Sequence, residues 1–302
     1  MTIKLGVRYD SFLKNRDTGT RSKVTVMEGP KPVTEDSRGI IGPEALRRHT
    51  RLDRYPAGTA LEGLIAWFWV ASWSLPANTV HTQELLTHPC ANLYVSPEEP
   101  NGVTKAELEG VLQQRSSRRL AGTGICVAAM TTPGGLGAFL DGPAGRYNDR
   151  VVPLGQAIGT DDQSLVTQIE ATDDEVAKVA VLRRALEAAV QEHRVEPARE
   201  VAAVARLAET DRTLRRVEQL ATEAGTSVRT LQRMFAEYAG VSPTWVLRRY
   251  RLLDAAESAR RGENVKWARI AADLGYSDQA HLVRDFSAAI GSTPAAYAKA
   301  TL

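Results

Sequence analysis

The sequence predicts an α+β protein, with a mostly-β, barrel-like (cupin-like) N-terminal domain and an all-α C-terminal domain. Three observations carry this prediction. Short apolar runs alternate with turn residues between about residues 40 and 170, and the pattern becomes helical from about residue 174. A helix-turn-helix pattern then occurs twice within the last hundred residues. The length of 302 residues suits about two domains.

The composition is that of an ordinary folded protein, with 43% hydrophobic and 25% charged residues. The 38 Lys and Arg against 36 Asp and Glu give a net charge of +2, which carries no polybasic signal for nucleic acid. Two cysteines are too few for a disulfide framework and suit a reducing compartment. The longest apolar run, Leu64 to Ala71, is too short to cross a membrane, and no secretory signal is apparent. We expect a cytoplasmic protein.

Four parts follow one another along the chain. Residues 1–35 are predicted to be a flexible leader, 36–172 a β-rich sensor or dimerisation domain, 173–197 a linker helix, and 198–302 a helical domain. Within the second part, the runs at 64–73, 83–97 and 122–130 predict strands, and 105–114 is a candidate helical patch.

The linker region has an amphipathic pattern from Glu175 to His193. We expect Pro197 to end this helix and a second helix to begin near Arg199. The apolar stripe favours packing on the β-rich domain over a coiled seam with a second subunit. It consists of Val176, Val179, Leu182, Leu186 and Val190.

The last third contains an internal repeat. RMFAEYAGVSPTWV at 233–246 matches RDFSAAIGSTPAAY at 284–297 with an offset of 51 residues. Each copy has a shorter helix, a glycine turn and a longer helix, which together make a helix-turn-helix motif. The shared positions are Arg233 and Arg284, Phe235 and Phe286, Gly240 and Gly291, and Ser242-Pro243 and Thr293-Pro294.

Each repeated residue has a physical role. Gly225 and Gly275 allow the left-handed conformation that ends a helix and turns the chain. Ser227 and Ser277 are expected to cap the following helix. Ser242 and Thr293 are expected to cap a further helix, and the proline that follows each of them loses no hydrogen bond at the first helical position.

The segment between the copies, Pro243–Arg261, predicts a helix of about 28 Å. Successive major-groove faces of B-DNA lie about 34 Å apart. A rigid connector of this length would let one chain present two recognition helices to adjacent groove segments.

The C-terminal repeat resembles the DNA-binding domain of the AraC/XylS family of bacterial transcription regulators. The second copy carries the resemblance through Gly275, Tyr276, Ser277, Phe286, Gly291, Pro294 and Tyr297. The upstream domain, through AFLDGPAGRYNDRVVPL at 138–154, resembles an uncharacterised sensor-domain type of actinobacterial members. The resemblance implies a β-barrel-like sensor and favours activation through contact with RNA polymerase, while the residues leave repression open.

Residues on the outward face of each second helix are the candidates for reading bases, because Arg bonds guanine and Gln bonds adenine with two hydrogen bonds each. The candidates are Arg229, Gln232 and Arg233 in the first copy, and Gln279, His281 and Arg284 in the second. Asp285 would repel phosphate unless it accepts a hydrogen bond from a cytosine amine or a neighbouring Arg. Phosphate contacts are expected from Arg248, Arg249, Arg251 and Lys266.

The N-terminal domain offers one candidate pocket. Trp67, Trp69 and Trp73 share one face of a strand and could line an effector pocket, although an aromatic core is the more common use of such a stripe. His81, His88 and Cys90 do not have the spacing of paired zinc ligands. A redox pair of Cys90 with Cys126 is a weaker alternative.

No phosphate loop, nucleophile elbow or zinc-protease motif occurs, so we expect no metal, no cofactor and no enzyme activity. The expected partners are double-stranded DNA, RNA polymerase, a small-molecule effector and a second copy of the chain. The sequence therefore predicts a DNA-binding transcription regulator that responds to an effector. Two alternatives stay open: a constitutive regulator whose N-terminal domain only dimerises or docks proteins, and an enzyme with an appended DNA-binding module.

Overall fold

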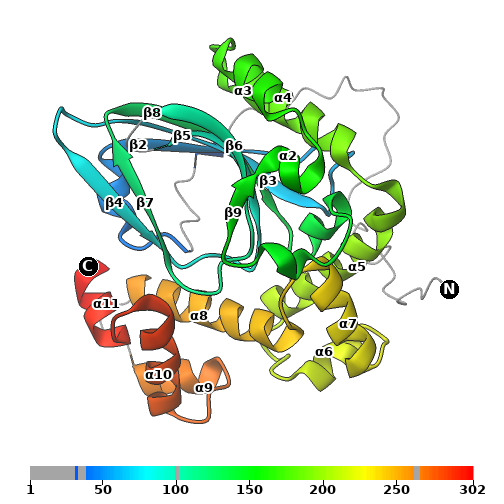
Figure 1. Ribbon diagram of the computed structural model, residues 1–302. Helices are drawn as coiled ribbons and strands as arrows, with labels where there is room; N and C mark the ends of the chain where they lie inside the picture. Colours follow the sequence, from blue (N-terminus) through cyan, green and yellow to red (C-terminus); the bar gives the residue numbers. More distant parts are fainter. Residues whose placement is uncertain (1–30, 33–38, 99–101, 262–265, 302) are drawn as a thin grey trace, which may run out of the picture.

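The computed structural model describes residues 31–32, 39–98, 102–261 and 266–301. The strands come first along the chain and the helices follow, so the molecule has a β-rich N-terminal part that lies against an all-α C-terminal part (Figure 1). The predicted fold class is confirmed. Almost all of the predicted leader, 1–35, lies outside the described residues, where only its Lys31–Pro32 segment is placed.

The main sheet has seven strands in the order β1-β2-β3-β8-β5-β6-β9, and all its neighbours are antiparallel. Two further strands, β4 (Val80–Leu85) and β7 (Ser116–Ala121), pair in a separate sheet. The described strands therefore form an open barrel-like layer that does not close on itself. The main-sheet strands are β1 (Lys31–Pro32), β2 (Thr50–Tyr55), β3 (Ile65–Ser74), β5 (Asn92–Glu98), β6 (Val103–Glu109), β8 (Thr123–Thr131) and β9 (Val151–Pro153).

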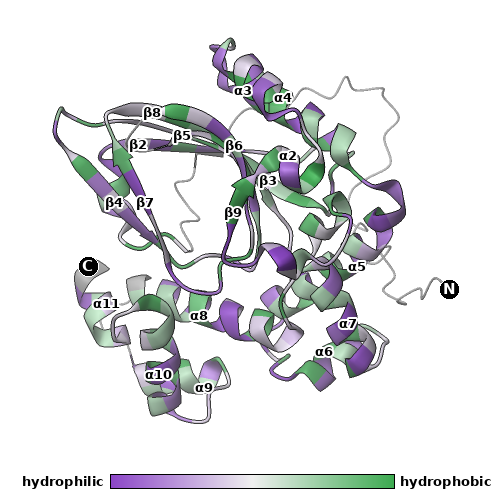
Figure 2. Ribbon diagram, viewed as in Figure 1, coloured by the Kyte–Doolittle hydropathy of each residue, from purple (hydrophilic) through white to green (hydrophobic). Residues whose placement is uncertain are grey.

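The strands predicted at 64–73 and 122–130 are confirmed as β3 and β8, which pair over most of their length. The run at 83–97 is divided between β4 and β5. The helical patch proposed for 105–114 is wrong, because its first half, 105–109, belongs to β6 and its second half is not helical. There Ala106 and Leu108 alternate into the core at the two-residue period of a strand. Figure 2 shows that β4 and β7 are largely hydrophilic, whereas the main sheet mixes apolar and hydrophilic residues.

Short helices and α4 (Glu175–Ala189) cover the main sheet. Val179, Leu182 and Leu186 of the predicted apolar stripe pack in one core with sheet residues such as Phe68 and Val127. The stripe therefore packs on the β-rich part, as the sequence favoured. The other covering elements are α1 (Pro43–Arg47), η2 (Gly135–Phe139), η3 (Ala144–Tyr147), α2 (Leu154–Ile158) and α3 (Asp162–Glu170).

The predicted break at Pro197 is wrong. The chain leaves α4 at Val190 and re-enters a helix, α5 (Glu192–Thr210), that continues through Pro197. Pro197 is the sixth residue of α5, beyond the first four N–H groups that lack helical partners, so the helix continues through it at the cost of one bond to the carbonyl of His193. Ala198, Val201 and Ala205 are buried on the following turns, and their packing stabilises the continuous helix.

The C-terminal helices form the two predicted copies. The first consists of α6 (Val217–Glu223) and α7 (Val228–Tyr238), and the second of α9 (Trp267–Asp273) and α10 (Gln279–Ile290). The connector α8 spans Pro243–Arg261, as predicted, and α11 (Pro294–Thr301) ends the described chain. A single apolar core includes side chains from both copies and from α8. Among the described residues, no helix is long and apolar enough to span a bilayer.

Candidate DNA-binding surface and N-terminal cavity

The first copy has the local chemistry of a helix-turn-helix motif. Gly225 has a φ of 63°, in the left-handed region that the turn requires. Ser227 caps α7, since its Oγ accepts from the backbone N–H of Thr230 at 3.1 Å. Leu231 and Phe235 are fully buried against the shared core. The apolar face of α7 is therefore fixed, and its opposite face is free to meet a ligand.

The three predicted base readers of the first copy lie on that opposite face. Arg229, Gln232 and Arg233 are all exposed, and their spacing of three and four residues places them side by side on the helix. Their position suits insertion into a major groove, where Arg and Gln have specific partners. Base reading by these residues remains a prediction.

The second copy differs from the expected cap. Asp278, and not Ser277, is the N-cap of α10: its Oδ1 accepts from the backbone N–H of His281 at 2.7 Å. Ser277 instead bonds the ring Nδ1 of His281 at 3.1 Å. Gln279 and Arg284 are exposed, whereas His281 is half-buried with its ring edge-on to Tyr276. Gln279 and Arg284 are thus accessible to DNA, whereas the His281 side chain is partly packed within the protein.

The expected phosphate contacts divide into two groups. Lys266 is exposed at the start of α9, as its role requires, and Arg251 is half-buried with Nη2 donating to the carbonyl of Arg215. Arg248 makes a two-point ion pair with Asp285, in which its Nε lies 2.6 Å from Oδ2. Arg248 is thus the neighbouring arginine that pairs with Asp285. Because it neutralises the carboxylate, Asp285 need not repel a DNA phosphate.

The phosphate role expected of Arg249 does not fit its position. Its side chain is buried, its Nη2 donates to the carbonyl of Gln113, and its guanidinium lies 4.6 Å from the centre of the Trp245 ring. Burial lowers the pKa of Arg249 to about 10, so it remains charged at neutral pH. The sequence pattern could not show this, because the contacting residue lies 136 positions away in the N-terminal part.

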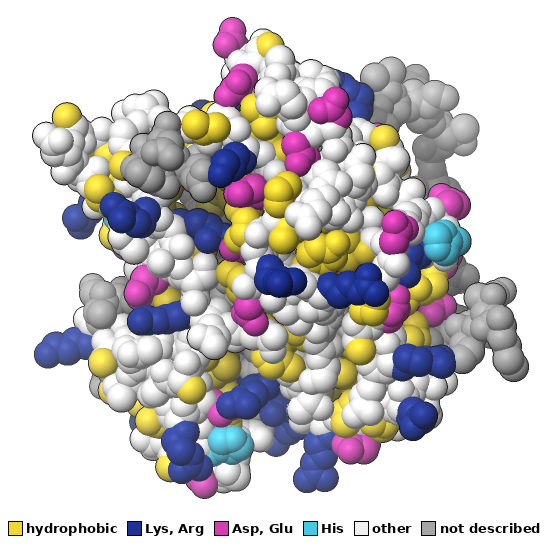
Figure 3. All heavy atoms as spheres, in the orientation of Figure 1, with side chains coloured by type: hydrophobic (Ala, Val, Ile, Leu, Met, Phe, Trp, Pro, Cys, Tyr) yellow, Lys and Arg dark blue, Asp and Glu magenta, His cyan; other side chains and the backbone are white. Residues whose placement is uncertain are grey.

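Basic side chains occur over both halves of the face shown in Figure 3, and several of them lie over its lower half, the region of the C-terminal helices in Figure 1. Residues 195–302 contain 16 Lys and Arg against 13 Asp and Glu, a net charge of +3. The DNA-binding part therefore relies on the placement of its basic residues rather than on a large excess of charge.

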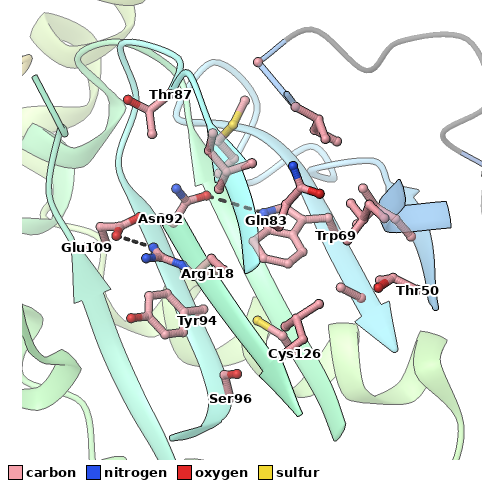
Figure 4. A pocket seen from close by; sticks show the side chains of 18 of the residues that line it. Thr50, Trp69, Gln83, Thr87, Asn92, Tyr94, Ser96, Glu109, Arg118 and Cys126 are labelled. Carbon is pink, nitrogen blue, oxygen red and sulfur yellow. Dashed lines mark hydrogen bonds and ion pairs between the residues drawn. The ribbon is translucent and has the colours of Figure 1, made fainter. Parts of the chain in front are cut away.

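A cavity of about 460 Å³ lies between the main sheet and the β4–β7 pair. All three predicted tryptophans, Trp67, Trp69 and Trp73, line it. Figure 4 shows Trp69 together with polar side chains from β5, β6 and β7 around the same space. The cavity thus has an aromatic wall and a polar wall, which is the usual constitution of a site for a small organic molecule.

The polar wall is internally bonded. Glu109 forms an ion pair with Arg118, Tyr94 donates to Glu107 Oε2 at 3.0 Å, and the Trp69 indole donates to Asn92 Oδ1 at 3.4 Å (Figure 4). Burial, with the nearby charge of Glu107, raises the pKa of Tyr94, so its phenol stays neutral. A ligand here would meet donors and acceptors already held in place. Had 103–109 been predicted as a strand, the two-residue period of β5 and β6 would have placed Asn92 and Tyr94, and Glu107 and Glu109, on one side of the sheet.

Two segments lead from the cavity to the C-terminal helices. Leu86 lines the cavity and also packs in the core of the C-terminal domain, together with Val111. Arg115 Nη1 donates to Glu84 Oε1 at 3.2 Å and to the carbonyl of Ile290, at the end of α10, at 3.3 Å. The β-rich part therefore contacts the second helix-turn-helix directly.

The first helix-turn-helix is also held by the β-rich part. Asn148 Nδ2 donates to the carbonyl of Gly240 at 2.6 Å. Arg194, in the first turn of α5, adds a contact from that helix: it lies over the Tyr238 ring and pairs with Glu237 at 2.8 Å, while its Nε donates to the carbonyl of Gly137 at 2.6 Å. Sequence reasoning missed these residues and Arg115, since no local pattern marks a side chain whose partner is distant in the chain.

The loose histidine and cysteine pattern forms no metal centre in the described ranges, where no three His, Cys, Asp or Glu side chains converge. His88 and Cys90 lie in the connection between β4 and β5, not on a strand, and both line the cavity. Cys90 and Cys126 are buried free thiols.

Comparisons with solved structures find a low overall similarity to ToxT from Vibrio cholerae. ToxT from strain O395 is 11% identical, with a TM-score of 0.38, covering 78% of this chain and 98% of that one. ToxT bound to (E)-4-(8-methylnaphthalen-1-yl)but-3-enoic acid is 11% identical, with a TM-score of 0.40, covering 78% and 99%. No curated protein matches the chain. A superposition at these scores carries no conclusion by itself.

Two family profiles match the sequence directly. A helix-turn-helix domain matches residues 220–300, which contain both copies of the motif from α6 onward. A domain of unknown function, DUF6597, matches residues 53–153, which contain the cavity-forming strands from β3 to β9. The chain thus carries a helix-turn-helix domain of the AraC type, with the recognition helix of each copy capped, behind a DUF6597 domain.

Proposed function

We propose that this regulator reads an extended DNA site with α7 and α10 and that a small molecule in the N-terminal cavity controls it. The observation that carries the effector role is Leu86, which contributes to the cavity wall and to the core of the DNA-binding domain. A ligand that moves this wall must change the packing beneath α8, because close-packed interiors transmit displacement.

The lining indicates the class of effector. Trp67, Trp69 and Trp73 offer broad apolar surfaces, while Asn92 and the Glu109–Arg118 pair offer fixed hydrogen-bonding groups. These features fit a compact amphipathic molecule with a flat, aromatic or otherwise apolar body and one polar end. The arrangement does not select a charge for the polar end, since Glu109 and Arg118 already neutralise one another.

The contacts of Arg115 and Asn148 support a regulatory link from this cavity to both helix-turn-helix copies. A ligand that binds the folded state stabilises it by mass action, by about 2.7 kcal/mol at a hundred times its dissociation constant. Regulation further requires that the ligand have different affinities for the DNA-bound and free proteins.

The test is a thermal-shift screen of the full chain with flat aromatic acids, amines and neutral amides, followed by DNA-binding titrations with each hit. A hit is expected to raise the unfolding temperature, to lose that effect in Trp69→Ala, and to change DNA affinity. Arg206→Ala, an exposed change on α5, serves as the control. Stabilising hits that leave DNA affinity unchanged would support the constitutive alternative, in which the N-terminal domain only dimerises or docks proteins.

Recruitment of RNA polymerase, action as a dimer and location in the cytoplasm complete the proposal; they rest on the family. An enzyme with an appended DNA-binding module is the remaining alternative. It would be favoured by turnover of a cavity ligand that stops when a lining residue such as Glu109 is replaced.

A further inference from the structure

We propose that Arg248 and Asp285 are positioning residues that set the angle between the two recognition helices and thereby the spacing of the DNA site. The inference rests on DNA binding by both helix-turn-helix copies and is independent of any effector. Arg248 lies in α8, the connector, and Asp285 lies in α10, the second recognition helix.

The geometry of the Arg248–Asp285 pair restricts the orientation of α10 relative to α8. Both guanidinium donors engage both carboxylate oxygens, with Nε 2.6 Å from Oδ2 and Nη2 bonded to Oδ1. Such a two-point pair restricts direction as well as distance. The Asp285 side chain is only 9% exposed, so its buried charge needs a partner. Arg248 is 55% exposed and reaches this carboxylate on α10 from the surface.

Other contacts tie the start of the first copy to the second. Arg215, just before α6, lies against Gly275, where a methyl group would come within 2.5 Å of its Cδ, and its Nη2 is 3.4 Å from the carbonyl of Ala272. Arg251 of α8 donates to the carbonyl of Arg215. The Arg215 contacts thus join the segment before α6 to the second copy, the Arg251 bond joins α8 to that segment, and the Arg248–Asp285 pair joins α8 to α10.

The connector alone cannot fix this geometry. The length of α8 sets how far apart the copies are, but apolar contacts such as those of Leu282 and Phe286 with the shared core are not directional. A small rotation of the second copy about α8 would move the outward side chains of α10 along the groove. The directional pair therefore decides which base-pair spacing both helices can read at once.

The experiment uses the full chain and sites selected from a random double-stranded DNA library. Affinity is then measured for the selected site, for the same site with one or two base pairs inserted between its halves, and for the first half alone. For the unchanged protein we expect an insertion to weaken binding roughly tenfold or more, because one helix loses its base contacts.

Asp285→Asn keeps the size of the side chain and removes its charge. We expect this variant to bind the first half-site with unchanged affinity. Inserting base pairs between the half-sites should change its affinity for the full site by no more than about twofold. Asp273→Asn is the matched control: it removes a carboxylate in the same copy, from an exposed pair with Arg269 at 3.7 Å, and should keep the full penalty. The exchange R248D with D285R should restore a spacing preference.

Three results would overturn the proposal. The first is an unchanged insertion penalty in Asp285→Asn. The second is an equal loss on the isolated first half-site, which would show a general folding defect. The third is the absence of any insertion penalty in the unchanged protein, since two independently bound helices need no fixed angle.

Discussion

Arg233 lies on the exposed face of α7, beside Arg229 in projection and opposite the buried Phe235. If it bonds a guanine edge, Arg233→Ala should weaken binding to the specific site by about 1–3 kcal/mol and relax the preference at one base position. Competition binding against a set of single-base variants of the selected site measures both effects.

The control for this change is Arg206→Ala, which removes an exposed arginine from α5, outside both motifs. It should leave the base preferences and the affinity within about a factor of two, as surface changes usually do. Equal weakening of Arg233→Ala on all sequences would instead identify Arg233 as a phosphate contact.

Cys90 and Cys126 both line the cavity, and both are buried. Burial raises the pKa of Cys126 to about 12 and raises the pKa of Cys90 as well. A raised pKa lowers the thiolate fraction, to roughly one in ten thousand for Cys126 at pH 8, and the thiolate is the reactive form.

We therefore expect slow reaction with Ellman's reagent in the native protein and rapid reaction of both thiols after denaturation. The same reaction at pH 7 and pH 9, below both raised pKa values, should stay slow in the native state. Rapid labelling of either thiol without denaturant would show that the cavity opens to solvent, and would revive the redox alternative.

At the scale of elements, the contact between η3 and the end of α7 depends on a glycine. Gly240 has a φ of 74°, and a methyl group there would lie 2.8 Å from the backbone nitrogen of Gly145. Gly225 has a φ of 63°, but the space beside it is open to 4 Å. Both Gly→Ala changes carry backbone strain of about 1–2 kcal/mol.

Only Gly240→Ala should carry a further steric cost, about 1–3 kcal/mol, because the backbone of η3 cannot move aside without loss of packing. Urea unfolding of the two variants compares the effects directly, with Gly225→Ala as the reference. Equal midpoints would mean that η3 is not held closely against α7 in solution.

Element boundaries show what local patterns can decide. The caps at Ser227, Ser242 and Thr293 were predicted and are formed, since a cap depends on residues only three positions apart. The cap of α10 shifted by one residue to Asp278, whose carboxylate is the stronger acceptor. The errors at 105–114 and at Pro197 occurred where burial against distant elements outweighed local preference.

At the scale of the whole molecule, charge predicts how DNA binding depends on salt. The exposed Lys266 can meet a phosphate, whereas Arg249 is buried and paired within the protein. Each phosphate contact contributes about 0.9 to the slope of log affinity against log salt. Lys266→Ala should therefore reduce the slope by about 1, and Arg249→Met should leave it unchanged.

The measurement is a titration of the selected DNA at several salt concentrations. Arg249→Met should instead lower the unfolding temperature, because it leaves the Gln113 carbonyl unpaired at the contact between the two parts of the molecule. A reduced slope in Arg249→Met would require this side chain to leave its buried position when DNA binds.

Features that repeat or alternate over short distances could be predicted from the order of the amino acids alone. These include the doubled motif with its glycines and caps, the length of α8, the exposed face of α7, and the strand that presents Trp67, Trp69 and Trp73. The net charge of +2 indicated no DNA-binding function, because it averages over faces that the fold separates.

Which polar side chains are exposed and which are used within the protein depends instead on long-range packing. It buried Arg249, paired Arg248 with Asp285, and placed Leu86 and Arg115 between the cavity and the DNA-binding helices. The sequence alone does not distinguish a helical arginine or lysine that faces solvent or a phosphate from one that bonds the carbonyl of a distant strand. Its partner is fixed by long-range packing, which local sequence patterns do not encode.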